Sequence, residues 1–182
     1  MVFQAQIASV TIEQFREIVM LPENAERLFE LINGEMIEKM PGRTSTSQFP
    51  LKLASSVIVH CKTQTLPCYV SGADGAYQVG GDVVAPDFAY KPTPMSEEYP
   101  DPVAPLWAVE VISPTDKAAN IRSKRQIDLD ANILLWELYP HLRRVDVYAP
   151  GEPPTSFQMG ETLNVGDLLP GFTLAVEEIF GE

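Results

Sequence analysis

The segment from Leu106 to Ile112, LWAVEVI, constrains the fold of this chain more than any other. Six of its seven residues are apolar, which predicts a strand buried on at least one face, and Ser113-Pro114 ends it. Because strand side chains alternate, Leu106, Ala108 and Glu110 share one face. Such a strand needs a sheet that other elements cover.

Glu110 is the one charged residue in this strand. An ionised glutamate in a sheet core costs free energy unless it is paired or binds a cation. One interpretation is therefore a functional carboxylate. The alternative is a glutamate at a sheet edge that faces water or bonds a neighbouring lysine, and the strand alone leaves both open.

The other patterns predict an α/β or α+β fold with a mixed sheet, in a single domain over residues 1–182. Asn33-Gly34 is the strongest turn signal, and two proline-rich segments, 91–105 and 149–155, predict loops. The expected elements are a helix from Thr11 through Val19, hairpin strands at 28–32 and 36–40, a helix that buries Leu51, Ala54, Ile58 and Cys61 with Pro50 in its first turn, extended runs at 68–70, 76–79 and 87–90, a helix capped by Thr115 or Asp116 that runs through Ala131, and strands at 134–138 and 144–148.

Asp87 is a second acid at the start of an apolar run, directly after Pro86 and 23 residues before Glu110. This spacing allows two adjacent strands joined by the proline-rich loop. Two carboxylates that converge from neighbouring strands would make an all-oxygen site suited to Mg²⁺ or Mn²⁺. The alternative is that Asp87 only caps the beginning of its strand.

Lys124 lies on the helix expected after the Glu110 strand, 14 residues further along the chain. An ammonium near a metal–carboxylate centre can orient the attacking water or stabilise negative charge on a phosphate. Because Lys117, Arg122 and Arg125 lie on the same helix, the alternative is a solvated basic face.

These residues resemble the active-site signature of the Uma-two family of restriction endonuclease-like proteins, within the PD-(D/E)xK nuclease superfamily. The resemblance rests on Pro86-Asp87, on Val109 to Pro114 and on Lys124, and it extends from the first helix and the 29–35 hairpin to the closing Leu168 to Phe172 and Ile179-Phe180. It implies a restriction endonuclease-like fold, a mixed sheet flanked by helices and preceded by an N-terminal helix and a β-hairpin.

The resemblance also implies roles for four residues. Asp87 and Glu110 correspond to the metal ligands, Lys124 to the catalytic lysine, and Glu30 to the family's hairpin acid near the site. In the usual superfamily pattern a lysine follows the acid by two residues, but that position is Ile112 here, and the next helix supplies Lys124 instead.

The chain departs from the family pattern in two regions. The family commonly has a histidine shortly after the position of Gly42, whereas this chain has none there, and Gln48 lies in that region. The stretch around Trp136 also differs, with Asn132 to Leu135 before it and Tyr139-Pro140 after it. The sequence assigns no role to Gln48 or to Glu35.

Charge limits the possible partners. The chain has 13 Lys and Arg against 25 Asp and Glu, a net charge of −12, which argues against tight non-specific binding of nucleic acid. Only two histidines are present, so a Ser-His-Asp mechanism has little material, and Cys61 and Cys68 are expected to be reduced thiols. No run of about 18 uncharged apolar residues predicts a membrane span, and no signal peptide is evident, so we expect a cytoplasmic protein.

The leading hypothesis is a divalent-metal-dependent nuclease that hydrolyses DNA phosphodiester bonds, with low affinity for DNA as its substrate. Cutting both strands would be simplest for a twofold homodimer. Two alternatives stay open, a catalytically inactive interaction module that retains the fold and a metal-dependent hydrolase of a smaller phosphorylated substrate.

Overall fold

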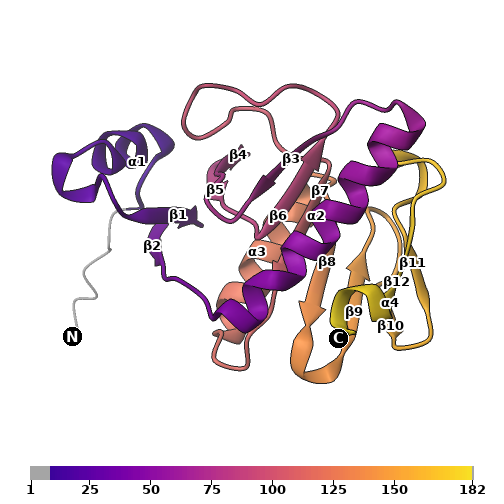
Figure 1. The fold of residues 1–182 in the computed structure, drawn as a ribbon. Helices are drawn as coiled ribbons and strands as arrows, with labels where there is room; N and C mark the ends of the chain where they lie inside the picture. The colour runs from indigo at the N-terminus through magenta and orange to yellow at the C-terminus, as the bar shows by residue number, and fades with distance from the viewer. Residues whose placement is uncertain (1–8, 182) are drawn as a thin grey trace.

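The computed structural model describes residues 9–181, which form two larger sheets, a small two-stranded sheet and four α-helices (Figure 1). The elements in chain order are α1 (Ile12–Val19), η1 (Pro22–Asn24), β1 (Leu28–Ile32), β2 (Glu35–Lys39), α2 (Thr44–Gln64), β3 (Tyr69–Gly72), β4 (Tyr77–Val79), β5 (Asp82–Val84), β6 (Phe88–Lys91), β7 (Trp107–Val111), α3 (Ala118–Asp130), β8 (Leu134–Tyr139), η2 (Pro140–Leu142), β9 (Arg144–Tyr148), β10 (Thr155–Gln158), β11 (Thr162–Asn164), η3 (Gly166–Leu168), β12 (Thr173–Ala175) and α4 (Val176–Phe180).

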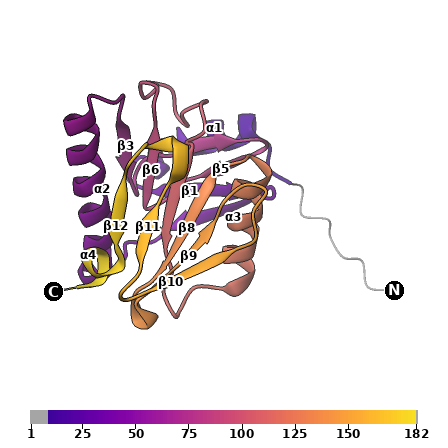
Figure 2. The same ribbon diagram turned by 90° about the vertical axis from the view of Figure 1, so that its right-hand side faces the viewer.

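The largest sheet has six strands in the order β10-β9-β8-β7-β6-β3. Strands β7 and β8 are parallel and α3 connects them, whereas the other neighbours are antiparallel. Helices α2 and α3 lie on opposite sides of this sheet (Figure 2). The prediction of a mixed sheet flanked by helices is therefore confirmed.

The two faces of β7 have different surroundings. Trp107 and Val109 pack with Trp136 against α2 and the small sheet β11-β12, and the two tryptophan rings meet edge to face with centroids 4.7 Å apart. Ala108 packs with Ile127 of α3 on the other side. Because side chains alternate, Glu110 shares the face of Ala108, as the sequence pattern predicts, and this face is the one that α3 covers.

A four-stranded sheet, β2-β1-β5-β4, carries the predicted hairpin. Strands β1 and β2 pair from Leu28↔Lys39 to Ile32↔Glu35, and the tight turn between them has Asn33 and Gly34 at φ 52° and 78°. These left-handed values are those that an Asn-Gly turn adopts at little cost. Helix α1 begins at the capping box predicted from Thr11.

The turn at Gly34 sets the position of both hairpin strands, so we expect Gly34→Ala to destabilise the protein. A Cβ there would be strained by the positive φ and would lie 1.8 Å from Ser9 Oγ. The cost should exceed the roughly 1–2 kcal/mol of the left-handed backbone alone. Urea unfolding measures it, with Gly80→Ala as control, since Gly80 has φ 60° and open space at its Cβ. Equal losses in both variants would show that Ser9 moves away freely.

Two expectations for the helices are wrong. Helix α2 begins at Thr44, so Pro50 lies inside it rather than in its first turn, and the buried side chains are those of Leu53, Val57 and Cys61. Leu51 is 71% exposed. Cys61 is buried as expected, and Ala54 is partly buried against the same core. Leu53 and Val57, rather than Leu51 and Ile58, pack in the core cluster that contains the two tryptophans.

The predicted cap of α3 is also wrong. Lys117 is the N-cap and supplies no side-chain hydrogen bond, while Asp116 accepts a hydrogen bond from the backbone N–H of Ser113 at 2.7 Å. Asp116 therefore closes the turn that leaves β7 rather than capping the helix. The sequence analysis also missed β5, β10, β11, β12 and α4.

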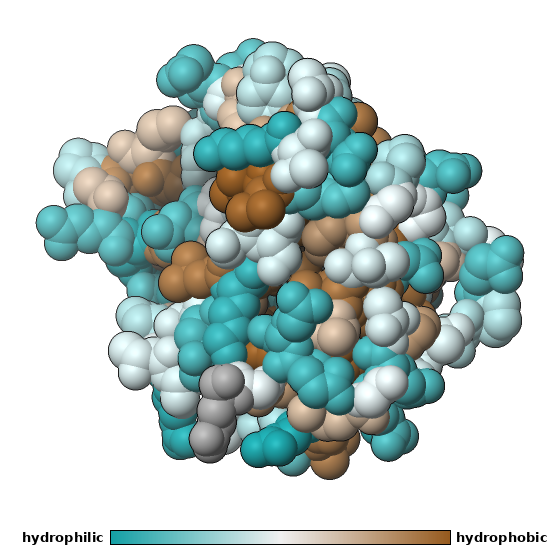
Figure 3. All heavy atoms as spheres, turned by 45° about the vertical axis from the view of Figure 1, so that its right-hand side comes forward, coloured by the Kyte–Doolittle hydropathy of each residue, from teal (hydrophilic) through white to brown (hydrophobic). Residues whose placement is uncertain are grey.

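The described surface is mixed in character. On the face shown in Figure 3, hydrophobic side chains lie in small groups among hydrophilic ones. The exposed large hydrophobic residues come from several elements, for example Met20 after α1, Val59 on α2 and Met159 after β10.

Among residues 9–181 no helix is long and apolar enough to cross a membrane. Cys61 and Cys68 are free thiols, as expected.

Candidate active site

Lys124 connects two predicted site residues. Its Nζ lies 2.5 Å from Glu110 Oε1 and 2.9 Å from Glu30 Oε1. The three side chains come from α3, β7 and β1, and each is at most 15% exposed. The solvated basic face is therefore wrong for Lys124. Glu110 lies on an inner strand and does not face water, but it does pair with a lysine, as the alternative allowed.

Asp87 reaches the same place from the strand next to β7. The pairing Phe88↔Val109 places Asp87 opposite Glu110, just before β6 begins. Asp87 Oδ2 accepts a hydrogen bond from the backbone N–H of Val111 at 2.8 Å. Thus the structure brings together all four residues that the sequence analysis selected.

Lys39 is a fifth charged residue of this cluster, and the sequence analysis missed it. It ends β2, and its Nζ lies 3.3 Å from Asp87 Oδ1 and donates a hydrogen bond to the carbonyl oxygen of Ala85. The backbone N–H of Ala85 donates to Glu30 Oε1 at 2.9 Å. One peptide segment therefore links the two lysine–carboxylate pairs.

Burial and like charge act together on Glu110. Burial raises the pKa of its carboxyl above the ordinary value, and this effect, with repulsion from Asp87 and Glu30, outweighs the attraction of Lys124 and Lys39. For Lys124 burial acts in the opposite sense, but Glu110 and Glu30 outweigh it and hold its pKa above the ordinary value. Lys124 is therefore a fixed positive charge among carboxylates.

Further acids line the α3 side of the sheet at the level of Glu110. Glu137 of β8 lies directly beside Glu110, and Asp146 of β9 lies directly beside Glu137. Arg125 binds Glu137 through two hydrogen bonds of 2.9 and 2.7 Å, and Tyr139 donates a third of 2.6 Å. Two consecutive residues of α3, Lys124 and Arg125, thus each bind a glutamate from one of two adjacent strands.

Asp128 is the one member of this region without a partner for a buried oxygen. It lies one turn after Lys124, is 2% exposed, and its Oδ1 makes no hydrogen bond within the described part of the chain. Burial raises the pKa of Asp128 to about 7, with Glu30 and Glu137 adding to the increase and Lys124 opposing it. Asp128 therefore keeps its proton at pH values well above those at which an aspartate usually ionises.

This raised pKa makes stability depend on pH in a definite direction. In the unfolded chain an aspartate ionises at about pH 3.9. The free energy of unfolding is therefore highest below that pH, where Asp128 is protonated in both states, and it decreases as the pH rises towards 7. We expect Asp128→Asn, which is neutral at every pH, to be more stable than the wild type at pH 8 by roughly 1–3 kcal/mol. At pH 5 the gain should be clearly smaller.

Urea unfolding at the two pH values measures this difference. Asp130→Asn is the matched control, because Asp130 lies on the same helix, is exposed and accepts a hydrogen bond from Gln126. A gain for Asp128→Asn that is equal at pH 5 and pH 8 would contradict the assigned protonation.

The oxygen donors at Asp87 and Glu110 fit a hard divalent cation. Glu110 receives no hydrogen bond from a backbone N–H of residues 9–181, and only the ammonium groups of Lys124 and, more weakly, Lys39 offset its charge there. The described residues contain no group of three Asp, Glu, His or Cys side chains arranged to hold a metal. Carboxylate oxygens are ligands that Mg²⁺ takes together with water.

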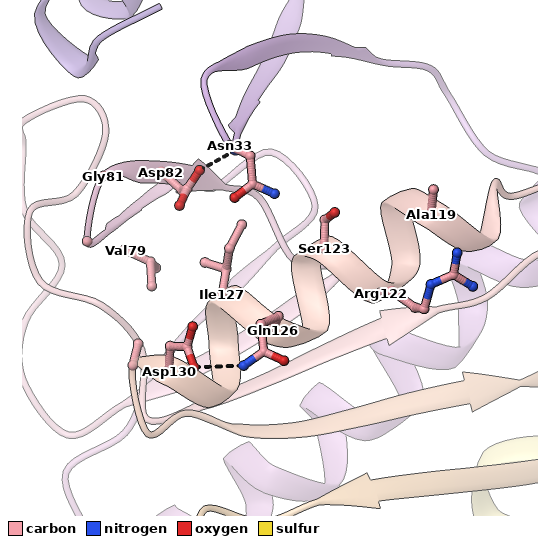
Figure 4. Close-up of a pocket in the computed structure, with 12 residues that line it drawn as sticks. Asn33, Val79, Gly81, Asp82, Ala119, Arg122, Ser123, Gln126, Ile127 and Asp130 are labelled. Carbon is pink, nitrogen blue, oxygen red and sulfur yellow. Dashed lines mark hydrogen bonds between the residues drawn. The ribbon is translucent and has the colours of Figure 1, made fainter. Parts of the chain in front are cut away.

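The surface pocket shown in Figure 4 is separate from this cluster. It has a volume of about 690 Å³ and lies between α3 and the turns of the four-stranded sheet, with Ser123 and Ile127 facing Asn33 and Asp82. None of Glu30, Asp87, Glu110 and Lys124 lines it. Charged side chains of both signs line the pocket, for example those of Arg122 and Asp130.

The two residues left without a role lie outside the cluster. Glu35 is exposed at the start of β2. Gln48 is exposed on α2, and its Nε2 donates to the carbonyl oxygen of Ser45.

Comparison with solved structures shows the fold. A putative nuclease belonging to DUF820 from Anabaena variabilis ATCC 29413 matches with a TM-score of 0.77 and 19% sequence identity, over 94% of this chain and 97% of the other. This similarity confirms the expected α+β fold, with a restriction endonuclease-like mixed sheet flanked by helices and preceded by a helix and a hairpin.

Comparison of the sequence with family models gives a match, whereas no curated protein matches. Residues 12–177 match the model named Uma2, described as a putative restriction endonuclease, which is the Uma-two family that the motifs resemble. The match includes Glu30, Asp87, Glu110 and Lys124 and covers most of the chain. This protein therefore belongs to the Uma2 family of putative restriction endonucleases.

Proposed function

We propose that this protein is a divalent-metal-dependent endonuclease that hydrolyses phosphodiester bonds in DNA. One observation carries the proposal, namely that Lys124 lies between Glu30 and Glu110 beside Asp87, at one end of the central strands. Membership of a family described as putative restriction endonucleases supports the same chemistry.

Asp87 and Glu110 would hold Mg²⁺ or Mn²⁺ in this proposal. Both are carboxylates, and repulsion between them is one cause of the raised pKa of Glu110, so positive charge between them stabilises the pair. A divalent cation held there would polarise the phosphodiester and lower the pKa of a bound water towards neutral pH. The backbone N–H of Val111 keeps Asp87 turned towards Glu110.

Lys124 is the catalytic residue that we assign to the reacting phosphate. Its ammonium is held charged by Glu30 and Glu110, so it can donate hydrogen bonds to a phosphate oxygen or to the attacking water as negative charge develops. Glu30 acts through Lys124, because it keeps the ammonium in place if Glu110 turns to a cation. We assign Glu30 as a positioning residue.

Charge defines the expected substrate interaction. A net charge of −12 repels phosphates, so DNA should bind weakly and depend on the cation for much of its attraction. A twofold homodimer would place two such sites on the two strands of a duplex. Analytical ultracentrifugation with and without duplex DNA tests the dimer, and a monomer in both conditions would argue against it.

The function is tested by incubating the purified protein with supercoiled plasmid and single-stranded DNA in Mg²⁺, Mn²⁺ or EDTA. Nicking in Mn²⁺ that EDTA abolishes is the expected result. Cleavage of bis(4-nitrophenyl) phosphate without cleavage of DNA would favour a hydrolase of smaller substrates. Cation binding without cleavage of either substrate would favour an inactive module, and absence of cation binding at millimolar concentration would contradict the metal assignment.

A further inference from the structure

Within residues 9–181, the polar partners of the Lys39 ammonium are all oxygen atoms. Its Nζ contacts the carbonyl oxygens of Ala73, at 3.5 Å, and of Ala85, as well as Asp87 Oδ1 at 3.3 Å. These oxygens come from two segments, the turn after β3 and the short connection between β5 and β6. Carbonyl and carboxylate oxygens are also the ligands of hard divalent cations. The ammonium therefore lies where positive charge is strongly favoured.

The position of Lys39 is fixed from both sides. Its side chain is 20% exposed, and Asp87 is held independently by the backbone N–H of Val111. The carbonyl of Ala85 accepts from Lys39, and the N–H of the same residue donates to Glu30. The ammonium thus cannot leave Asp87 without breaking contacts to at least two segments.

Each proposed metal ligand consequently has its own lysine. Glu110 pairs with Lys124 at 2.5 Å, and Asp87 pairs with Lys39 at 3.3 Å. A cation that binds both carboxylates must share each of them with an ammonium or displace it. Like charges a few ångströms apart in a partly buried site repel, and this repulsion is large enough to change an affinity about tenfold.

We infer that Lys39 is a positioning residue that competes with a divalent cation for Asp87 and so sets the cation concentration at which the site fills. The inference rests on the proposed function, because it takes Asp87 as a cation ligand. Lys39 holds Asp87 in place when the cation is absent and opposes the cation when it arrives. The resulting affinity is weaker than the two carboxylates alone would give.

The test compares Mn²⁺ binding by isothermal titration calorimetry in the wild type, Lys39→Met, Lys39→Arg and Lys62→Met. Methionine keeps an unbranched apolar stem without the charge, so Lys39→Met should bind Mn²⁺ about tenfold more tightly, or about 1.4 kcal/mol. Arginine keeps the charge, so the affinity of Lys39→Arg should stay within about threefold of the wild type. Lys62 is exposed on α2 and outside the cluster, so its variant should be unchanged.

Two further measurements keep the outcome clear. Circular dichroism without metal confirms that each variant is folded, and the increase in Tm with Mn²⁺ should be larger for Lys39→Met than for the wild type. In the plasmid assay, the Mn²⁺ concentration that gives half-maximal nicking should fall about tenfold, in line with the affinity.

The outcomes separate this inference from the proposed function. If the wild type binds Mn²⁺ and nicks DNA but Lys39→Met binds equally or more weakly, Lys39 is only structural and the inference is overturned alone. If only Lys39→Met binds Mn²⁺, the competition is supported and the wild type is not a metal enzyme under those conditions. If no form binds Mn²⁺, the metal assignment and the inference both fail.

Discussion

Replacing Glu110 with glutamine should abolish Mn²⁺-dependent nicking, leaving a rate indistinguishable from that of the metal-free protein. Glutamine keeps the shape of the side chain but removes the charge that a divalent cation requires. Lys124 still has Glu30 at 2.9 Å, so the ammonium stays in place. Calorimetry should show at least about a tenfold loss of Mn²⁺ affinity, since a ligand is lost rather than a distant charge.

Glu110→Gln should remain folded without metal. The raised pKa of Glu110 shows that burial of its charge opposes folding, so a neutral side chain there costs little or stabilises the protein. Glu35→Gln is the matched control, because Glu35 is an exposed glutamate of the hairpin outside the cluster, and it should nick DNA at the wild-type rate. Full activity of Glu110→Gln would remove Glu110 from the metal site.

Replacing Lys124 with methionine should have two large effects. The nicking rate should fall about 10²-fold or more, which is the usual loss when one preorganised electrostatic group is removed from a reacting centre. The metal-free protein should also lose about 3–5 kcal/mol of stability, because Glu30 and Glu110 are left buried without a counter-charge. The second effect does not follow from the sequence, because only the structure shows that Glu30 and Glu110 both contact Lys124.

The two effects of Lys124→Met can be measured separately. Urea unfolding gives the loss of stability, and Mn²⁺ should recover part of it by supplying positive charge at Glu110. Adding Glu30→Gln should recover stability but not the nicking rate. Lys117→Met serves as the control for an exposed lysine that precedes the same helix. A full recovery of nicking in the double variant would show that Lys124 acts only through the fold.

The sequence predicts the parts of the site that depend on local pattern. Alternation in 106–112 places Glu110 on the α3 side, and the Asn33-Gly34 turn predicts the hairpin that carries Glu30. The resemblance to a family supplies Asp87 and Lys124 as partners. These features require only periodicity, turn chemistry and an ordered set of motifs.

Lys39 and Asp128 could not be found in this way. The oxygens around Lys39 belong to residues 34 to 48 positions further along the chain, and two of them are backbone carbonyls that no side-chain pattern marks. Asp128 looks like any polar residue of a charged helix until the sheet beneath it is known. The short strands β10 to β12 were missed for a related reason, because each has only three or four residues and gains its stability from its pairing partner.

The neighbouring ion pairs Lys124–Glu110 and Arg125–Glu137 restrict where residues can be inserted in this part of the chain. These two ion pairs hold α3 against β7 and β8 at the same level of the sheet, and together they restrict rotation of the helix about its axis and translation along it. An insertion in the exposed turn at 114–117 precedes Lys124 and Arg125 in the chain, so the helix can keep both ion pairs. An insertion between Arg125 and Glu137 displaces the second ion pair relative to the first, so we expect this stretch to reject a change in its number of residues.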